Sequence, residues 1–172
     1  MASSKQDPDI IIHVVKNFKD IDLSTPEIKK LVKTVCNRFA EHETRNTGYE
    51  VSIAIVDDNE IRELNSRFLN RRAATDCLSF DLSNDEKGPK IFDLVVNGQM
   101  AVRQASLRRH SGKAELALYI THGLLHNLGF DDSTDGRARK MHQAEDEILQ
   151  QLGYGLVYNK NTSIKEQLST GY

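Results

Sequence analysis

The chain has 172 residues, a length typical of one domain, and its formal net charge of −2 gives it no general attraction to nucleic acid. No apolar run approaches the roughly 20 residues that a membrane helix needs. The first residues lack the apolar stretch of a secretory signal, so we expect a cytoplasmic protein without a membrane segment. The two cysteines, Cys36 and Cys77, match no metal-binding or redox spacing, and we expect buried free thiols.

The first part of the chain predicts two strands with a helix between them. Residues 9–15 are rich in β-branched side chains, and residues 49–56 alternate apolar and polar positions, as a strand with one buried face does. Residues 24–42 carry apolar side chains at helical spacing. We expect Thr25 to cap this helix and Pro26 to occupy its first position.

The rest of the chain adds a pair of strands and several helices. Residues 57–69 predict a helix that begins on capping aspartates and points Phe68 toward a core. Turn-forming residues separate two further strands, at 76–82 and 90–96, which we expect to pair. Strands come early and helices late, which indicates an α+β fold. The later predicted helices span residues 98–109, 113–128 and 135–152.

The stretch ALYITHGLLHNLGFDDSTD, residues 117–135, carries the most distinctive chemistry. His122 and His126 lie one helical turn apart with Cβ atoms about 6 Å from each other, so both rings can reach one ion. Gly129 can end the helix in a left-handed conformation and return the chain past the histidines. Asp131 and Asp132 lie on that return, and either can supply a third ligand, which leaves a fourth position open as in catalytic zinc sites.

A histidine pair at helical spacing often arises by chance and is weak evidence for a metal when taken alone. The combination of the pair, the helix-ending glycine and the adjacent carboxylates favours a metal site, because Leu116, Ile120 and Leu124 are placed to hold another face of the helix in the core. Zinc proteases have a glutamate directly after the first histidine as general base, whereas this chain has Gly123. A peptidase mechanism of that type would therefore have no general base in this chain.

The segment HGLLHNLGFDD resembles the H-G-x-L-H-L-x-G-Y-D-H signature of the YbeY family, which are metal-dependent single-strand endoribonucleases acting in ribosomal RNA maturation and ribosome quality control. Upstream, LNSRFLNRRAATDCLSFDL and IFDLVVNGQMAVRQA are similar to other motifs of the family, so the resemblance covers most of residues 50–152. It implies a small mixed sheet packed with several helices, a central metal-site helix and one zinc ion per chain. It also implies single-stranded RNA, ribosomal RNA in particular, and the ribosome or small-subunit proteins as partners.

Departures from the family motifs mark this chain as a divergent member. Asp132 stands where the family has its third histidine and inherits that ligand position, while Leu69 replaces an arginine. Aspartate binds zinc at about 2.0–2.2 Å, so coordination can survive the first change. The site carries one positive charge less than a three-histidine site, so bound water is less acidified and harder metals are better tolerated.

Arg71 and Arg72 are the catalytic candidates, because a nearby guanidinium can clamp a phosphate that Leu69 cannot bind. Solvated loop charges are an equally good interpretation of both. Three further interpretations are minority ones, since each has a common structural alternative. They are hydroxyl groups directed at the site from Thr75 and Ser79, a metal or ligand-supporting role for His142 rather than an exposed helix position, and RNA contact by the basic stretch 103–113.

The leading hypothesis is a metal-dependent endoribonuclease in which His122, His126 and Asp132 hold a zinc-like ion that activates water. One alternative is a ribosome-associated RNA-binding protein with a structural metal, and another is a metal hydrolase of a different substrate such as peptide. We expect residues 1–157 to form a single metal-hydrolase-like domain and residues 158–172 to form a polar tail.

Overall fold

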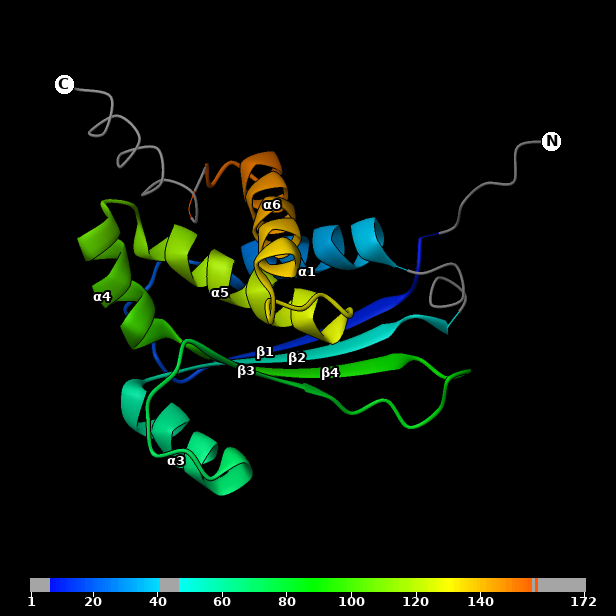
Figure 1. Ribbon diagram of the computed structural model, residues 1–172, viewed down its shortest axis with the longest axis horizontal. Coiled ribbons are helices and arrows are strands. Elements are labelled where there is room, and N and C mark those ends of the chain that lie inside the picture. The colour runs from blue at the N-terminus through cyan, green and yellow to red at the C-terminus, as the bar shows by residue number, and fades with distance from the viewer. Residues whose placement is uncertain (1–6, 41–46, 156, 158–172) are drawn as a thin grey trace.

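The computed structural model describes residues 7–40, 47–155 and 157, and its centre is a four-stranded mixed sheet with the order β1-β2-β4-β3 (Figure 1). The first three strands in this order are parallel, and β3 runs antiparallel to β4. All four predicted strands are present with ends within one residue of expectation, and the predicted pairing of the last two is confirmed. The strands are β1 (Ile10–Lys16), β2 (Tyr49–Val56), β3 (Cys77–Asp81) and β4 (Lys90–Asn97).

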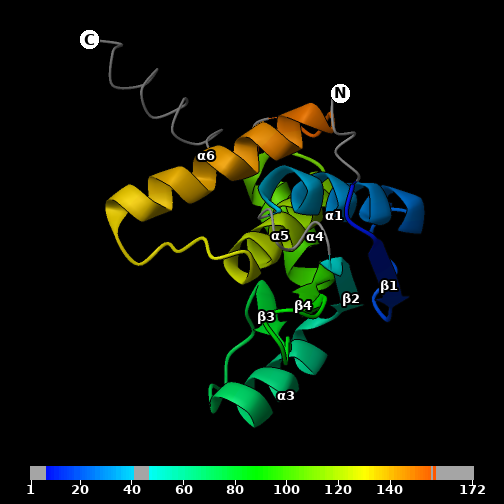
Figure 2. The same ribbon diagram turned by 90° about the vertical axis from the view of Figure 1, so that its right-hand side faces the viewer.

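Helices cover both faces of the sheet unequally. Figures 1 and 2 show α1, α4, α5 and α6 on one side of the sheet and α3 on the other. Helix α5 lies between the sheet and the layer that holds α1 and α6, so the metal-site helix is central as expected. The predicted α+β class is confirmed. The helices are α1 (Thr25–Phe39), α3 (Asp58–Leu69), α4 (Gly98–Arg108), α5 (Gly112–Asn127) and α6 (Asp135–Gln151).

The start of α1 differs from the sequence prediction by one residue. Ser24, not Thr25, is the N-cap: its hydroxyl accepts from the backbone N–H of Glu27, and the Glu27 side chain accepts from the backbone N–H of Ser24. This reciprocal capping box satisfies two backbone donors at once, which is why it defines the helix start. Pro26 is then the second helical residue. Helix α1 ends at Phe39.

The polar tail predicted for residues 158–172 lies outside the described residues.

The main hydrophobic core joins α1, α5 and α6 to the inner face of the sheet. Leu116, Ile120 and Leu124 are completely buried, as predicted, so the apolar faces of α5 hold it in place. Gly123 allows its close approach, since a Cβ there would lie 2.6 Å from the Sγ atom of Cys77 on β3. Both cysteines are free, and burial raises the pKa of each thiol.

Helix α3 packs less completely than its sequence pattern indicates. Ile61 is fully buried, but Phe68 is 59% exposed, so the prediction that Phe68 points into a core is wrong. Phe68 instead packs edge-on against Phe80 and lines an apolar groove of about 440 Å³ on the outer face of the sheet. No helix in the described ranges combines the length and apolar character that crossing a membrane requires.

Candidate metal centre

The end of α5 directs the chain back toward the two histidines. Gly129 has a φ angle of +96°, which a glycine adopts without steric cost. Its N–H donates to the carbonyl of His126 at 3.0 Å, and the N–H of Phe130 donates to the carbonyl of Leu125 at 2.9 Å. These two bonds form a Schellman motif, which satisfies the last carbonyls of the helix and reverses the chain. The next residues therefore return toward the exposed side of α5.

His122, His126 and Asp132 come together at this turn, and their ligand atoms all lie within 4.8 Å of one another. The two Nε2 atoms are 3.1 Å apart. Oδ2 of Asp132 lies 3.8 Å from Nε2 of His126 and 4.0 Å from Nε2 of His122. Asp132, from the loop after α5, therefore completes a three-donor group with the helix pair.

These distances fit a tetrahedral ion. Nitrogen ligands about 2.0–2.1 Å from such an ion lie about 3.3–3.4 Å from each other. The separation of 3.1 Å between the Nε2 atoms of His122 and His126 is close to this value, and the Asp132 carboxylate needs a shift of only a few tenths of an ångström. The three residues therefore have the donor types and the spacing to hold one divalent metal.

Sequence reasoning did not assign a role to Glu145 of α6, which contacts His122 through the ring nitrogen that does not face the other candidate ligands. Its carboxylate is fully buried and accepts hydrogen bonds from Nδ1 of His122 at 2.6 Å and from Nδ1 of His142 at 2.9 Å. A hydrogen bond at Nδ1 fixes the tautomer in which the Nε2 lone pair of His122 is available to a metal. The contact also shows that the expectation of an exposed His142 is wrong, because that side chain is only 18% exposed.

Electrostatics at His122 reflect this carboxylate. Burial lowers the pKa of His122. The hydrogen bond and negative charge of Glu145, together with the charges of Asp76 and Asp132, raise the pKa by more than burial lowers it, so the net pKa lies above the usual value of 6.5. The carboxylates around His122 therefore favour a positive charge on this ring. A divalent cation would compete with a proton for the same lone pair.

Asp131, the other carboxylate considered as a ligand, does not belong to the three-donor group and is bound to residues that follow it in the chain. It accepts hydrogen bonds from the backbone N–H of Ser133 at 2.6 Å and the hydroxyl of Ser133 at 2.8 Å, and it pairs with Arg137. These bonds, the backbone bond foremost, lower the pKa of Asp131 to about 2. Asp131 therefore stabilises the turn before α6, and Asp132 is the carboxylate beside the histidine pair.

Arg71 and Arg72 lie in the exposed loop that follows α3, which ends on the left-handed residue Asn70. Within the described residues, neither guanidinium forms an ion pair or hydrogen bond with the candidate ligands. The loop leads into β3, whose Phe80 carbonyl accepts a bond from Asn127 at the end of α5. The arginines thus sit on a segment connected to the metal helix, without direct contact.

Thr75 and the basic stretch 103–113 have local partners, and Ser79 lies within β3, in register with Leu94 of β4. The hydroxyl of Thr75 donates to the neighbouring Asp76, in line with a structural role. In the stretch 103–113, Arg103 pairs with Asp58 and Lys113 pairs with Glu27. Much of the positive charge of that stretch is therefore used inside the molecule.

A small mixed sheet, with a central helix that presents two histidines to a loop carboxylate, places this chain among α+β proteins with a candidate metal centre. The chain belongs to the Endoribonuclease YbeY family, whose model matches residues 13–153. This confirms the resemblance seen in its motifs.

Related proteins cover most of the chain. A protein of Desulforamulus reducens is 36% identical over 148 residues, which are 81% of this chain and 96% of the relative. A protein of Clostridioides difficile is 32% identical over 132 residues, 73% of this chain and 86% of the relative. Both are named Endoribonuclease YbeY. The solution structure of a Thermotoga maritima protein has the same fold, with a TM-score of 0.56 and 22% identity, covering 82% of this chain and 91% of that one.

Proposed function

We propose that this protein is a metal-dependent endoribonuclease that cleaves single-stranded RNA in ribosomal RNA maturation and ribosome quality control. The observation that carries the proposal is the group formed by His122, His126 and Asp132 in a chain of the Endoribonuclease YbeY family. The relatives that match over most of the chain bear the endoribonuclease name. A peptidase is less well supported, because Gly123 occupies the position of the protease base.

His122, His126 and Asp132 would hold one zinc ion, although the donor set also accepts other divalent metals. When bound, the ion supplies Lewis-acid chemistry, which polarises a phosphoryl oxygen and acidifies water. Glu145 keeps the His122 ring oriented through its hydrogen bond at Nδ1. The exposed fourth side of the group is where a phosphodiester would approach, since all three candidate ligands are partly exposed.

Arg71 and Arg72 are the proposed phosphate-binding residues of the substrate path. Both guanidinium groups are exposed, and Leu69, at the position of the family's arginine, cannot bind a phosphate. Their forked donors suit the oxygens of a phosphodiester. Replacing both with glutamine should weaken RNA binding and lower its salt dependence, since lost phosphate contacts reduce the slope of affinity against salt. Unchanged affinity and slope would place the RNA path elsewhere.

The proposed partners are ribosomal RNA and the ribosome or its small-subunit proteins, in the cytoplasm. The apolar groove that Phe68 and Phe80 line on the outer face of the sheet supports a protein partner, because exposed apolar surface of this kind is typical of interaction sites. Phe68 belongs to α3, which Figure 2 shows on the side of the sheet opposite α5, so a protein bound in this groove leaves the metal centre open.

The decisive experiment is cleavage of a single-stranded ribosomal RNA fragment by the purified protein, with and without a chelator. We expect cleavage that the chelator stops and zinc restores, and no cleavage by His126→Ala at unchanged fold. A protein that binds the RNA and retains one metal per chain but never cuts it would support the structural-metal alternative instead. Cleavage that continues at full rate in the chelator would contradict metal dependence.

A further inference from the structure

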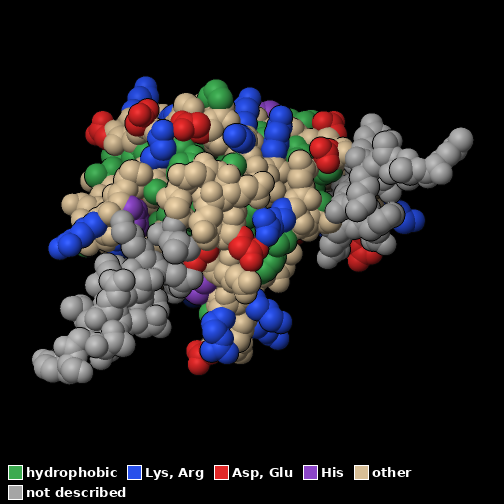
Figure 3. All heavy atoms as spheres, turned by 90° about the horizontal axis from the view of Figure 1, so that it is seen from above, with side chains coloured by type: hydrophobic (Ala, Val, Ile, Leu, Met, Phe, Trp, Pro, Cys, Tyr) green, Lys and Arg blue, Asp and Glu red, His purple; other side chains and the backbone are tan. Residues whose placement is uncertain are grey.

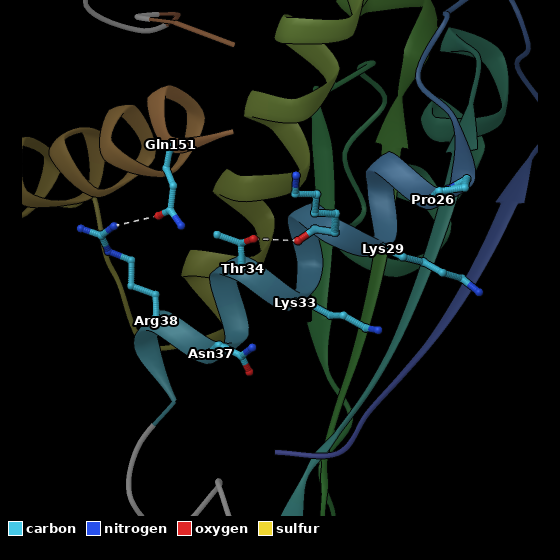
Figure 4. A pocket seen from close by; sticks show the side chains of 8 residues that line it. Pro26, Lys29, Lys33, Thr34, Asn37, Arg38 and Gln151 are labelled. Carbon is cyan, nitrogen blue, oxygen red and sulfur yellow. Dashed lines mark hydrogen bonds between the residues drawn. The ribbon is translucent and has the colours of Figure 1, made fainter. Parts of the chain in front are cut away.

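A groove of about 710 Å³ lies along the exposed face of α1, and Gln151 of α6 lines it beside Arg38, whose guanidinium donates to the Gln151 side chain (Figure 4). We call it the α1 groove. Its lining residues recur every three or four positions along the helix, so they form one continuous face opposite the buried apolar side chains of α1. The basic members of this lining are Lys29, Lys30, Lys33 and Arg38, and its polar members include Thr34 and Asn37.

Among the residues that the structure describes, the charge of the α1 groove has a single sign, because its lining there holds basic and no acidic side chains. Arg38 pairs with Glu147 of α6. The one acidic residue of α1, Glu27, is bound to Lys113 at 2.9 Å and to the helix cap, so it does not neutralise the groove. Within the described ranges, the three lysines form no ion pair. They therefore carry three uncompensated positive charges on a chain whose formal net charge is −2.

A solvated helix face is the ordinary explanation of exposed lysines, and such faces usually mix both signs. Figure 3, which views the side of the molecule that bears α1 and α6, shows basic and acidic side chains interspersed over most of that surface. The α1 groove departs from this mixed pattern, because the charged residues of its described lining are all basic. A protein partner is also a poor match, because protein interfaces are depleted in lysine and depend on apolar or aromatic anchors, whereas Pro26 is the only apolar residue among the described residues of the lining.

We propose that the α1 groove binds the sugar-phosphate backbone of single-stranded RNA, as a second contact site outside the metal centre. Lysines act as point charges toward phosphates and read no sequence, while Thr34, Asn37 and Gln151 offer hydrogen bonds to phosphate or ribose oxygens. Helix α6 connects the two places, since its Glu145 contacts His122 and its Gln151 lines the groove. The inference rests on the proposed endoribonuclease function for the identity of the polyanion.

The test is a salt titration of RNA binding by the full-length protein, measured by fluorescence anisotropy with a labelled single strand of about 20 nucleotides, longer than the ~4–16 nucleotides that one binding site covers. EDTA prevents cleavage during the measurement. In the variant Lys29→Gln/Lys30→Gln/Lys33→Gln the slope of log affinity against log salt should fall by about 2, because each phosphate contact to a single strand contributes about 0.7. Affinity at low salt should fall about tenfold or more.

Two controls make the result specific. Replacing Lys19, Lys87 and Lys90, which lie outside the groove, with glutamine changes the net charge equally and should leave slope and affinity near the wild-type values. Arginine at the three groove positions keeps the charge and should keep the binding. The proposal is overturned if the groove variant binds like the wild type, or if groove and control variants weaken equally.

A failure of the proposed endoribonuclease function can be distinguished from a failure of the α1 groove as an RNA-binding site. Cleavage of an RNA of about five nucleotides, near the lower limit of a single binding site, reports on the metal centre alone. It should be equal in the wild type and the groove variant. If the wild type cuts no RNA while the groove variant still loses binding, the endoribonuclease proposal fails and the RNA site stands.

Discussion

The Glu145 carboxylate, which bridges Nδ1 of His122 and Nδ1 of His142 at full burial, should control metal affinity. Glu145→Gln keeps the shape of the side chain and removes its charge. A hydrogen bond to a charged group contributes about 1.5–3 kcal/mol. Loss of a carboxylate that orients a metal-bound histidine typically costs about 10–100-fold in affinity, or about 1.4–2.7 kcal/mol. The two ranges agree, so we expect the zinc Kd of Glu145→Gln to rise about 10–100-fold.

The assay is a competition titration of zinc against a chromophoric chelator, with thermal melts of the metal-free proteins to confirm folding. Glu147→Gln is the matched control, because Glu147 lies two positions away on α6 and pairs with Arg38 instead of a histidine. Its zinc affinity should equal that of the wild type. If Glu145→Gln binds zinc within about twofold of the wild type, the bridge does not orient the ligand and the reasoning is refuted.

Three other predictions concern the loop, the helix contact and acid stability. Zinc affinity should fall sharply in Asp132→Ala and less in Asp131→Ala, and Asp132→His should retain it; the opposite order in zinc titrations would reassign the third ligand. Gly123→Ala should cost about 1–3 kcal/mol in urea unfolding through overpacking, because its Cβ would lie 2.6 Å from the sulfur of the facing cysteine; full stability would show that the helix can shift freely. Hydrogen bonds, that from Lys113 foremost, lower the pKa of Glu27 from 4.5 to about 2, so its contribution is present above pH 4.5 and is lost as the pH falls toward 2. The stability difference between wild type and Glu27→Gln, at most about 1 kcal/mol for so exposed a pair, should disappear over that interval, and a difference that persists at pH 2 would contradict it.

Local sequence patterns predicted the elements because strands and helices are set by near neighbours along the chain. Alternation found β2, and the pairing of β3 with β4 followed from the turn between them. The start of α1 was misplaced because serine and threonine are both good caps. Counting three positions back from Glu27 identifies Ser24 as the partner in the capping box.

The site was predictable only where its residues are close in sequence. His122, His126 and the two aspartates of the following loop share one helix end, so spacing and the glycine grouped them, while the family resemblance singled out Asp132. Glu145 lies on another helix, and its contact with His122 depends on how α5 and α6 pack, which no local period encodes. One signal was present: Glu145 falls on the same face as the buried Met141 and Ile148, where an acidic residue needs a partner.

The three candidate ligands are not held equally rigidly, and this difference affects how fast a metal ion can enter and leave the site. His122 and His126 are fixed on a buried helix, whereas Asp132 belongs to a loop and is 46% exposed. An ion can therefore exchange with solvent by displacement of one carboxylate while α5 stays folded. Loading and loss of the metal should then be faster than global unfolding, and the protein should take up whichever divalent ion its surroundings supply in excess.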